Sequence, residues 1–279
     1  MKKTFQIIGL IGLTIFSFFL TDKTVTVVNN MDDLMIELKS NKNNYSTDAV
    51  DATIDGNTII PGIRGKTVNI NKSYKNMKKN GYYSDKLYVY DYKNPKISIS
   101  DNMDKYIVKG NPLKRMVSLV LLVKSEDDIN GILNVLNNYS VKATFFVDES
   151  WFYNNSKIIP EIIKSGHNIE LFYDDYSDEN YEWIDTVIKR INKKSFGFCY
   201  NSSDSENNIN SCMKKGNYTI RPLRISEITP LVDIKEKLEP GAIISLSINS
   251  ELKKELSTII IYIKSKGLKI ANLTDNILE

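Results

Sequence analysis

Residues 117–123 read VSLVLLV, an almost uninterrupted apolar run, and this stretch decides the fold class. A strand of a parallel sheet is buried on both faces, so its apolar residues are consecutive rather than alternating. Residues 129–138 follow with apolar side chains at helical spacing, and residues 142–147, KATFFV, form the next apolar run. The order strand, helix, strand predicts a parallel α/β sheet with right-handed crossovers.

The same alternation continues through the rest of the chain. We expect five further strands, most of them separated from the next by a helix, at residues 167–173, 195–200, 217–222, 242–248 and 268–273. Seven strands of this kind favour a closed or nearly closed (β/α) barrel, and an open doubly wound sheet is the alternative. A barrel presents its functional site at the C-terminal ends of its strands.

Residues 1–23 are predicted to be an N-terminal signal-anchor. Lys2 and Lys3 precede an uncharged segment, residues 4–20, that is close to the length needed to span a bilayer. The small residues that mark a cleavage site are missing, which favours an uncleaved anchor. The chain is then a single-pass cell-membrane protein with its bulk extracellular, and a secreted protein with a cleaved signal is the alternative.

Three further segments are expected. Residues 24–47 are predicted to be a stalk or linker, residues 48–112 a small β-rich unit, and residues 113–279 the barrel. In the β-rich unit, Tyr88, Tyr90 and Tyr92 alternate along one predicted strand and share one face. This tyrosine row either stacks on a ligand or packs on a neighbouring element.

Composition excludes several classes of function. The 37 basic and 34 acidic side chains are scattered along the chain, so no basic surface indicates a nucleic-acid partner. His167 is the single histidine, which excludes mechanisms that need several imidazoles. Cys199 and Cys212 are the two cysteines, and they can pair in an exported protein or pack as small apolar side chains.

The series of apolar strands contains short motifs in a characteristic order. VSLVLLV and KATFFV are followed by GHNI at 166–169, GAII at 241–244 and KGLKI at 266–270. This series resembles the NodB-homology polysaccharide deacetylases over roughly residues 113–279. The resemblance implies a distorted seven-stranded (β/α) barrel and an extracellular glycan of the peptidoglycan or chitin type as the ancestral substrate.

The resemblance also implies a chemistry, which is hydrolysis of an N-acetyl amide. In the family, one aspartate and two histidines hold a divalent metal that polarises the carbonyl and activates water. A second aspartate is the general base, and a histidine from a late strand is the general acid.

This chain departs from that pattern at every aligned position that carries the metal or the acid–base chemistry. The family's paired aspartates fall on Leu122 and Val123, its two metal histidines on Phe172 and Tyr176, and its late histidine and aspartate on Ser247 and Ile248. Only Tyr200 survives from the family loop that orients the base. The sequence therefore predicts no catalytic residue at these positions, no metal, no cofactor, and an apolar filling of the former site.

Two alternatives remain open at the barrel top. A rebuilt metal site would use Asp127, Asp128, Asp174 and Asp175, although acidic residues also occur in ordinary helix caps and loops. Aromatic residues can stack on sugar rings, and the candidates for a glycan-binding groove are Tyr173, Tyr176, Tyr200 and Trp151, together with His167.

The function that the sequence favours is that of a membrane-anchored, extracellular deacetylase-like protein without catalysis. Its expected partner is a cell-wall polysaccharide or a surface protein, with the membrane contacted through residues 4–20 and no nucleic acid bound. The alternatives are an active N-deacetylase with a rebuilt metal site and a structural protein that binds no glycan.

Overall fold

The computed structural model describes residues 11, 13–18, 20–21, 32–124, 129–172, 178–200 and 206–279. The chain divides into two compact units. The small unit contains the described residues up to Ala49 together with Arg64–Asn94, and the large unit contains Val50–Ile63 and Pro95–Glu279. This division differs from the boundaries expected after residues 47 and 112.

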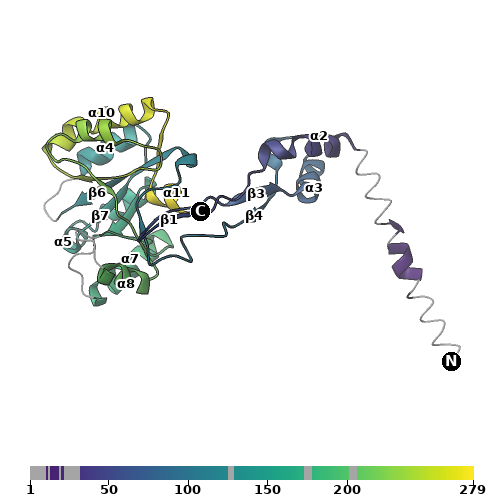
Figure 1. Ribbon diagram of the computed structural model, residues 1–279, viewed down its shortest axis with the longest axis horizontal. Helices are drawn as coiled ribbons and strands as arrows, with labels where there is room; N and C mark the ends of the chain where they lie inside the picture. Colours follow the sequence, from purple (N-terminus) through teal and green to yellow (C-terminus); the bar gives the residue numbers. More distant parts are fainter. Residues whose placement is uncertain are drawn as a thin grey trace. The chain divides into compact units, whose positions relative to one another are not determined.

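From Asp32 onward, the described residues of the small unit form helices and a two-stranded antiparallel sheet (Figure 1). Its elements are α2 (Asp33–Asn41), η1 (Lys42–Tyr45), β3 (Gly65–Val68), α3 (Ile70–Asn80), η2 (Asp85–Leu87) and β4 (Tyr90–Lys93). Met35 and Leu38 of α2 are buried against side chains of α3 and the sheet. Residues 33–45, expected to belong to a stalk, are therefore part of a folded unit, because their apolar face finds a partner.

The large unit confirms the predicted parallel sheet. Each of the seven predicted strands overlaps a strand of the structure. These strands are β6 (Met116–Val123), β7 (Thr144–Val147), β8 (Asn168–Leu171), β9 (Phe198–Cys199), β10 (Tyr218–Thr219), β12 (Ile243–Ser247) and β13 (Lys269–Ile270). An additional strand, β11 (Leu223–Arg224), pairs with β12. All the ladders among these strands are parallel.

The ladders follow the course of a distorted ring. The order β12–β6–β7–β8 is continuous, and a parallel bridge between Phe172 and Tyr200 leads on to β9 and β10. From β10, residues 106–110 lead back to β12 through the bridges Ile107 to Ile220 and Lys109 to Ala242. Residues 106–110, which precede the seven predicted strands, therefore complete the ring.

Where the ring closes, a glycine permits two backbone segments to lie close together. Gly241 has a φ angle of +91°, and its backbone N–H donates to the carbonyl of Met116 at 2.7 Å. A Cβ atom at Gly241 would lie 2.2 Å from the carbonyl oxygen of Gly110. The turn into β12 thus requires a residue without a side chain.

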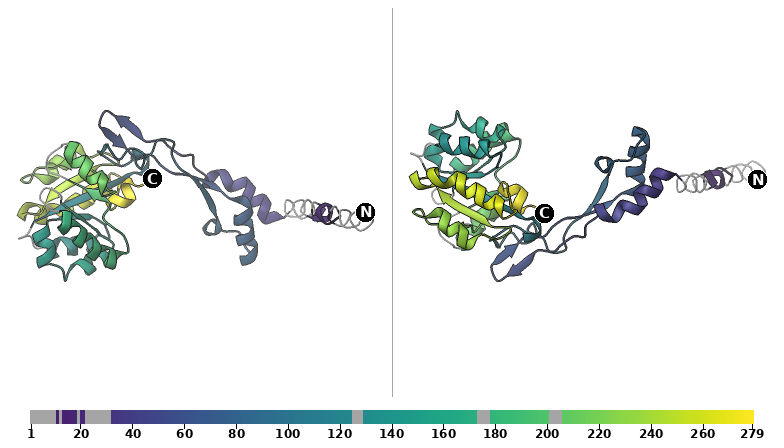
Figure 2. Two further views of the ribbon diagram at one scale, coloured as in Figure 1. Left: turned by 90° about the horizontal axis from the view of Figure 1, so that it is seen from below. Right: turned by 90° about the horizontal axis from the view of Figure 1, so that it is seen from above.

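Helices surround the strands of the large unit (Figure 2), most of them on the side of the outer core, whereas the last helix contributes Leu273 and Ile277 to the inner core. The helices are α4 (Asn130–Asn138), α5 (Glu149–Asn154), α6 (Ile159–Lys164), α7 (Asp178–Asn192), α8 (Glu206–Lys214), α9 (Pro230–Lys237), α10 (Ser250–Ser265) and α11 (Leu273–Ile277), with the short η3 (Pro112–Lys114) before β6. The strand expected at 268–273 ends early, because the side chain of Asn272 caps α11 by accepting from the N–H of Asp275 at 2.9 Å.

Two apolar cores lie on the two sides of the strands. The outer core packs the strands against the helices and includes Leu119, Leu121 and Val123 of β6. The inner core lies on the other side and contains the alternate residue Val120. Its further buried members are Ala52, Ile59, Ile99, Ile107, Phe146, Phe198, Tyr200, Ile220, Ile243, Leu273 and Ile277.

The composition of the inner core corrects the expected β-rich unit at 48–112. The hairpin of β1 (Thr53–Asp55) and β2 (Thr58–Ile60) pairs with β5 (Tyr106–Ile107), and all three strands belong to the large unit. Ile59 and Ile107 are almost fully buried in the inner core. The segment is divided between the two units because its apolar residues complete two different cores.

Within the described part of the chain, no helix is both long enough and apolar enough to cross a bilayer. Most of the predicted span at 4–20 lies outside the described residues, so the anchor stays a prediction.

Candidate functional site

The C-terminal end of β6 carries the first two family positions, and its residues point to opposite sides of the sheet. Leu122 is half-buried and packs against the inner core, whereas Val123 is buried in the outer core. In register, Leu122 lies beside Phe146 of β7 and Ser247 of β12. An alkyl side chain neither binds a cation nor accepts a proton, so these two positions do not fit the family's metal and base.

Phe172 occupies the next family position, directly after β8. Its ring lies edge-on to the ring of Tyr200, with centroids 5.5 Å apart, and it packs against the inner core. Tyr200 also lies edge-on to Phe146, with centroids 5.9 Å apart. Phe172 therefore packs against apolar and aromatic side chains at a position where the resemblance implies an imidazole ligand.

The late-strand positions are also without acid–base groups. Ser247 is half-buried at the end of β12, and Ile248 is 8% exposed in the outer core. The neighbouring Asn249 caps α10 by accepting from the N–H of Leu252 at 2.8 Å. A hydroxyl and an alkyl group do not supply the general acid of the family chemistry.

Three residues expected to line a glycan groove are buried instead. Trp151 is fully buried in the outer core, Tyr200 is 4% exposed, and His167 is 2% exposed. Trp151 lies one turn inside α5, whose N-cap Asp148 accepts from the Trp151 N–H at 2.6 Å. These side chains offer no ring face to a sugar, because Trp151 is enclosed in the outer core and Tyr200 in the inner core.

The other candidates lie outside the described residues. They are Tyr173 and Tyr176 of the expected groove and Asp127, Asp128, Asp174 and Asp175 of the expected rebuilt metal site. Among the residues that the structure does describe, no group of three histidine, cysteine, aspartate or glutamate side chains is arranged to hold a metal ion. Leu122, Val123 and Phe172, which the resemblance aligns with the family's paired aspartates and a metal histidine, have side chains that do not fit a metal.

Glu170 is a buried acid that the sequence did not single out. It lies between two outer-core residues of β8 and is 4% exposed. Its Oε2 accepts from the N–H groups of Gly197 and Phe198 at 3.0 and 3.1 Å, so the side chain takes part in joining β8 to β9. Burial raises the pKa of this carboxyl to about 8, although the two hydrogen bonds act in the opposite direction.

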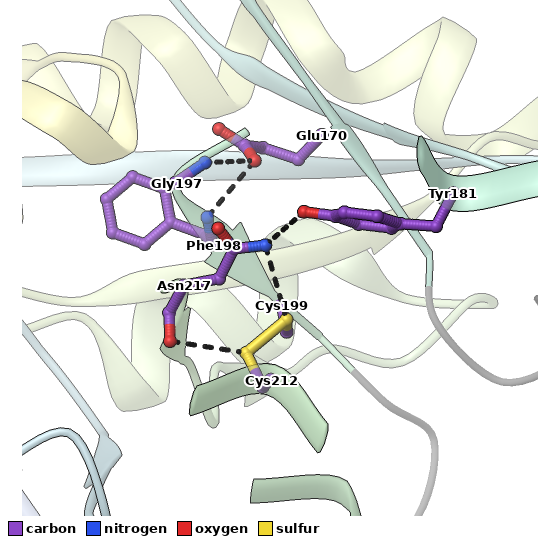
Figure 3. Close-up of a disulfide and its surroundings, with 7 residues drawn as sticks. All are labelled: Glu170, Tyr181, Gly197, Phe198, Cys199, Cys212 and Asn217. Carbon is purple, nitrogen blue, oxygen red and sulfur yellow. Dashed lines mark hydrogen bonds between the residues drawn. A yellow bond between two sulfur atoms is a disulfide. The ribbon is translucent and has the colours of Figure 1, made fainter. Parts of the chain in front are cut away.

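Cys199 and Cys212 form a disulfide between β9 and α8 (Figure 3). Of the two possibilities that the sequence left open, the structure shows the bridge. Asn217 lies beside it and donates from Nδ2 to the hydroxyl of Tyr181 at 2.5 Å. The bridge therefore ties β9, and with it Tyr200, to the helix layer.

An exposed aromatic pair was not predicted from the sequence. Tyr153 of α5 and Trp183 of α7 stack with ring centroids 5.1 Å apart and an interplanar angle of 20°. Their exposed fractions are 46% and 48%, and buried Phe152 lies edge-on to Trp183. Both helices follow the C-terminal ends of their strands, β7 and β8, which is the edge where a barrel presents its site. The pairing joins two separate helices, so no local pattern indicates it.

Comparisons with known proteins agree with this architecture. Residues 109–194 match the family described as polysaccharide deacetylase. The uncharacterised protein YlxY of Bacillus subtilis strain 168 is 36% identical over 148 residues, which are 52% of this chain and 46% of that protein. The chain thus spans about half the length of this curated relative.

Two solved structures from Bacillus species have a similar fold. Wild-type BA3943 of Bacillus anthracis, described as a CE4 family pseudoenzyme, is 22% identical with a TM-score of 0.64, and the match covers 88% of this chain and 95% of that chain. PdaA of Bacillus subtilis, a family 4 carbohydrate esterase, is 17% identical with a TM-score of 0.54, covering 61% and 84%. At these identities the likeness is one of fold.

Proposed function

The chain carries a degenerate polysaccharide deacetylase domain of the NodB-homology family, and from this premise we propose that it binds a cell-wall glycan without deacetylating it. The observation that carries the proposal is the packing of Phe172 and Leu122 against the inner core at positions where the family holds its metal and its base. The pseudoenzyme BA3943, which has a similar fold, is a precedent for such a protein.

The loss of catalysis follows from the requirements of the reaction. Hydrolysis of an amide needs a group that activates water, a group that stabilises the oxyanion, and an acid for the leaving amine. At the described family positions, the side chains of Leu122, Phe172 and Ile248 supply none of these. A charge placed among these side chains without its metal would be costly, which favours the apolar residues once the metal is lost.

The exposed pair Tyr153–Trp183 supports a retained affinity for glycan. Aromatic ring faces pack well on the apolar face of a sugar, and a stacked pair presents a fixed surface of this kind at little entropic cost. The pair lies at the same edge of the strands as the family positions, so a glycan chain could reach it without entering the filled interior.

The membrane location belongs to the same proposal. Residues 4–20 would anchor the protein with both units outside the cell, where a wall glycan is accessible. A surface protein is the alternative partner, and a secreted chain is the alternative form.

The test combines a binding assay with an acetate assay on the full chain. We expect insoluble peptidoglycan or chitin to sediment the protein, and we expect no acetate release with zinc, cobalt, manganese or calcium under conditions in which an intact deacetylase works. Trp183→Ala should weaken binding by about fivefold or more, because a sugar–ring contact is lost. Tyr82→Ala removes a ring that is 57% exposed in the small unit and is the control.

The two tryptophans make the binding visible in solution. Trp151 is fully buried and Trp183 is half-exposed, so a soluble oligosaccharide should change the fluorescence of Trp183 alone. Metal-dependent acetate release that is lost on replacing Asp174 and Asp175 would instead establish a rebuilt active site. Failure of the wild-type chain to bind any wall glycan would leave the interaction-protein alternative.

A further inference from the structure

The tyrosine row of the small unit lies on one face of the β3–β4 sheet. Lys66 is paired with Tyr92 and Val68 with Tyr90 across the two strands. Directly opposed residues of an antiparallel pair point to the same face, as do alternate residues of one strand. Lys66, Tyr90 and Tyr92 therefore share the face that carries Val68 into the core.

Other side chains of the small unit bury only one end of the tyrosine row, the end at Tyr88. Tyr88 is 7% exposed, lies 4.6 Å from Tyr45 between ring centroids, and shares a hydrogen bond of 2.8 Å between its hydroxyl and that of Tyr83. The row then runs outward through half-buried Tyr90 to Tyr92, which is 60% exposed. Packing on a neighbouring element thus accounts for the first tyrosine of the row and leaves the last one unexplained.

Two cations lie over the uncovered rings. The Nζ of Lys66 is 4.8 Å from the centroid of the Tyr90 ring, and the Cζ of Arg64 is 5.3 Å from that of Tyr92. The Nε of exposed Arg64 donates to the Oδ1 of Asn94 at 2.8 Å, which fixes the guanidinium further. A guanidinium has five N–H donors, so Arg64 has further donors for an anionic group besides the one that bonds Asn94.

The two cations keep their charge. Lys72 pairs with Asp91 and Lys78 with Asp32, whereas Arg64 and Lys66 form no ion pair with any residue that the structure describes and lie over tyrosine rings instead. A cation–π contact holds each of the two cations in place without neutralising it. The face therefore holds two preorganised positive charges that alternate with two tyrosine rings.

We propose that Arg64, Lys66, Tyr90 and Tyr92 form a binding face for an acidic polysaccharide. Carboxylates of the polymer pair with Arg64 and Lys66, and its sugar rings lie on the exposed parts of the tyrosines. This face belongs to a different unit from the proposed glycan site of the deacetylase-like domain. This face recognises the negative charge of the polymer through Arg64 and Lys66, whereas the pair Tyr153–Trp183 has no charged group.

The chemistry of the face favours a polysaccharide over a membrane surface. A basic residue near an anionic bilayer contributes about 1 kcal/mol, so two of them alone give weak attachment. A polysaccharide uses the rings as well as the charges. Alternate residues of a strand are also about 7 Å apart, which spreads the two charges along a line that suits an extended polymer.

The test uses the full chain and polygalacturonate as the probe, with fully methyl-esterified polygalacturonate as the uncharged comparison. We expect the wild-type chain to bind the acidic polymer, with affinity falling as salt rises, and to bind the ester at least about tenfold more weakly. Lys66→Ala and Arg64→Ala should each weaken binding to the acid about fivefold to tenfold, and Tyr92→Ala should weaken binding to both polymers.

Matched controls separate this face from general charge. Lys93 is exposed, is paired with Gly65 beside Lys66 in the same sheet, and points to the opposite face. Lys93→Ala removes the same charge and should leave binding unchanged, and Tyr82→Ala should do likewise. Vesicles of phosphatidylglycerol provide the membrane comparison.

Several outcomes would overturn the proposal. Equal losses for Lys66→Ala and Lys93→Ala would show attraction by net charge alone. Binding to the vesicles but not to polygalacturonate would assign the face to a membrane, and the absence of wild-type binding to the polymer would exclude an acidic polysaccharide. Peptidoglycan sedimentation that depends on Trp183 is a separate readout, so the earlier proposal can stand or fall independently.

Discussion

Phe172 and Tyr200 join two strands and fill the interior at the same place. Their backbones form the parallel bridge between β8 and β9, and their rings lie edge-on with centroids 5.5 Å apart. The family resemblance puts a metal-binding histidine at the position of Phe172. Phe172 packs against the inner core instead, so the side chain that cannot bind a metal at this position contributes packing.

Replacing Phe172 tests this structural role. We expect Phe172→Ala to lower the free energy of unfolding by about 2 kcal/mol, less than for a fully buried phenylalanine because the ring is only partly buried. Urea denaturation followed by circular dichroism measures the change. Tyr92→Ala, which removes an exposed ring in the small unit, is the control and should cost less than about 0.5 kcal/mol.

A change below about 0.5 kcal/mol for Phe172→Ala would contradict the packing role. It would mean that the ring stands over an open site instead of filling it.

The strands that the sequence predicted best are those buried on both faces. VSLVLLV and KATFFV are apolar at consecutive positions because β6 and β7 have the outer core on one side and the inner core on the other. The two-residue strands β9, β10 and β11 are too short to show a period of their own. The closure of the ring through residues 106–110 depends on contacts between distant segments, which no local pattern encodes.

The sequence predicted which metal-binding side chains are missing from the candidate site more fully than it predicted which aromatic side chains are exposed there. The register of VSLVLLV and GHNI identified Leu122 and Phe172 as apolar replacements, because residue type alone decides whether a side chain can bind a metal. Whether an aromatic residue is exposed depends on which helix covers it. Trp151 and Tyr200 were therefore expected at a surface and are buried, whereas Trp183 is exposed.

The disulfide is predicted to stabilise the large unit. Cys199 and Cys212 are separated by 13 positions, and closing a loop of this size stabilises a protein by about 3 kcal/mol in the chain-entropy account. Dithiothreitol should lower the urea midpoint of the wild-type chain, and Cys199→Ala/Cys212→Ala should show a similar loss. The double variant should no longer respond to the reductant, which is the internal control.

A wild-type midpoint that is the same with and without reductant, together with free thiols detected in the native protein, would contradict the bridge.

Glu170 is predicted to make stability fall as pH rises. Burial raises the pKa of its carboxyl from about 4.5 to about 8, so the folded protein keeps a proton that the unfolded chain releases. The unfolded state then binds fewer protons between these pH values, and the free energy of unfolding declines across this window. The full effect is on the order of a few kcal/mol.

Glu170→Gln removes the titration and keeps an oxygen that can accept from Gly197 and Phe198. We expect the stability of this variant, relative to that of the wild type, to increase from pH 5 to pH 8. Glu182→Gln, a substitution at an exposed position of α7, should show no such trend. A difference between wild type and Glu170→Gln that is independent of pH would indicate a carboxyl with an ordinary pKa.

His167 is predicted to have the opposite effect, and it can be observed directly because the chain has one histidine. Burial, assisted by the nearby charge of Lys142, lowers the pKa of its imidazole to about 4. The Nδ1 atom accepts from the N–H of Ala143 at 3.2 Å, which requires the neutral ring. The contribution of the neutral His167 ring to the free energy of unfolding is complete above the unfolded pKa of about 6.5 and is lost as pH falls towards 4.

The single imidazole signal in the proton NMR spectrum should therefore titrate near pH 4 in the folded protein and near 6.5 in urea. A midpoint near 6.5 in the folded protein would mean that the ring is accessible to water and could still belong to a binding surface.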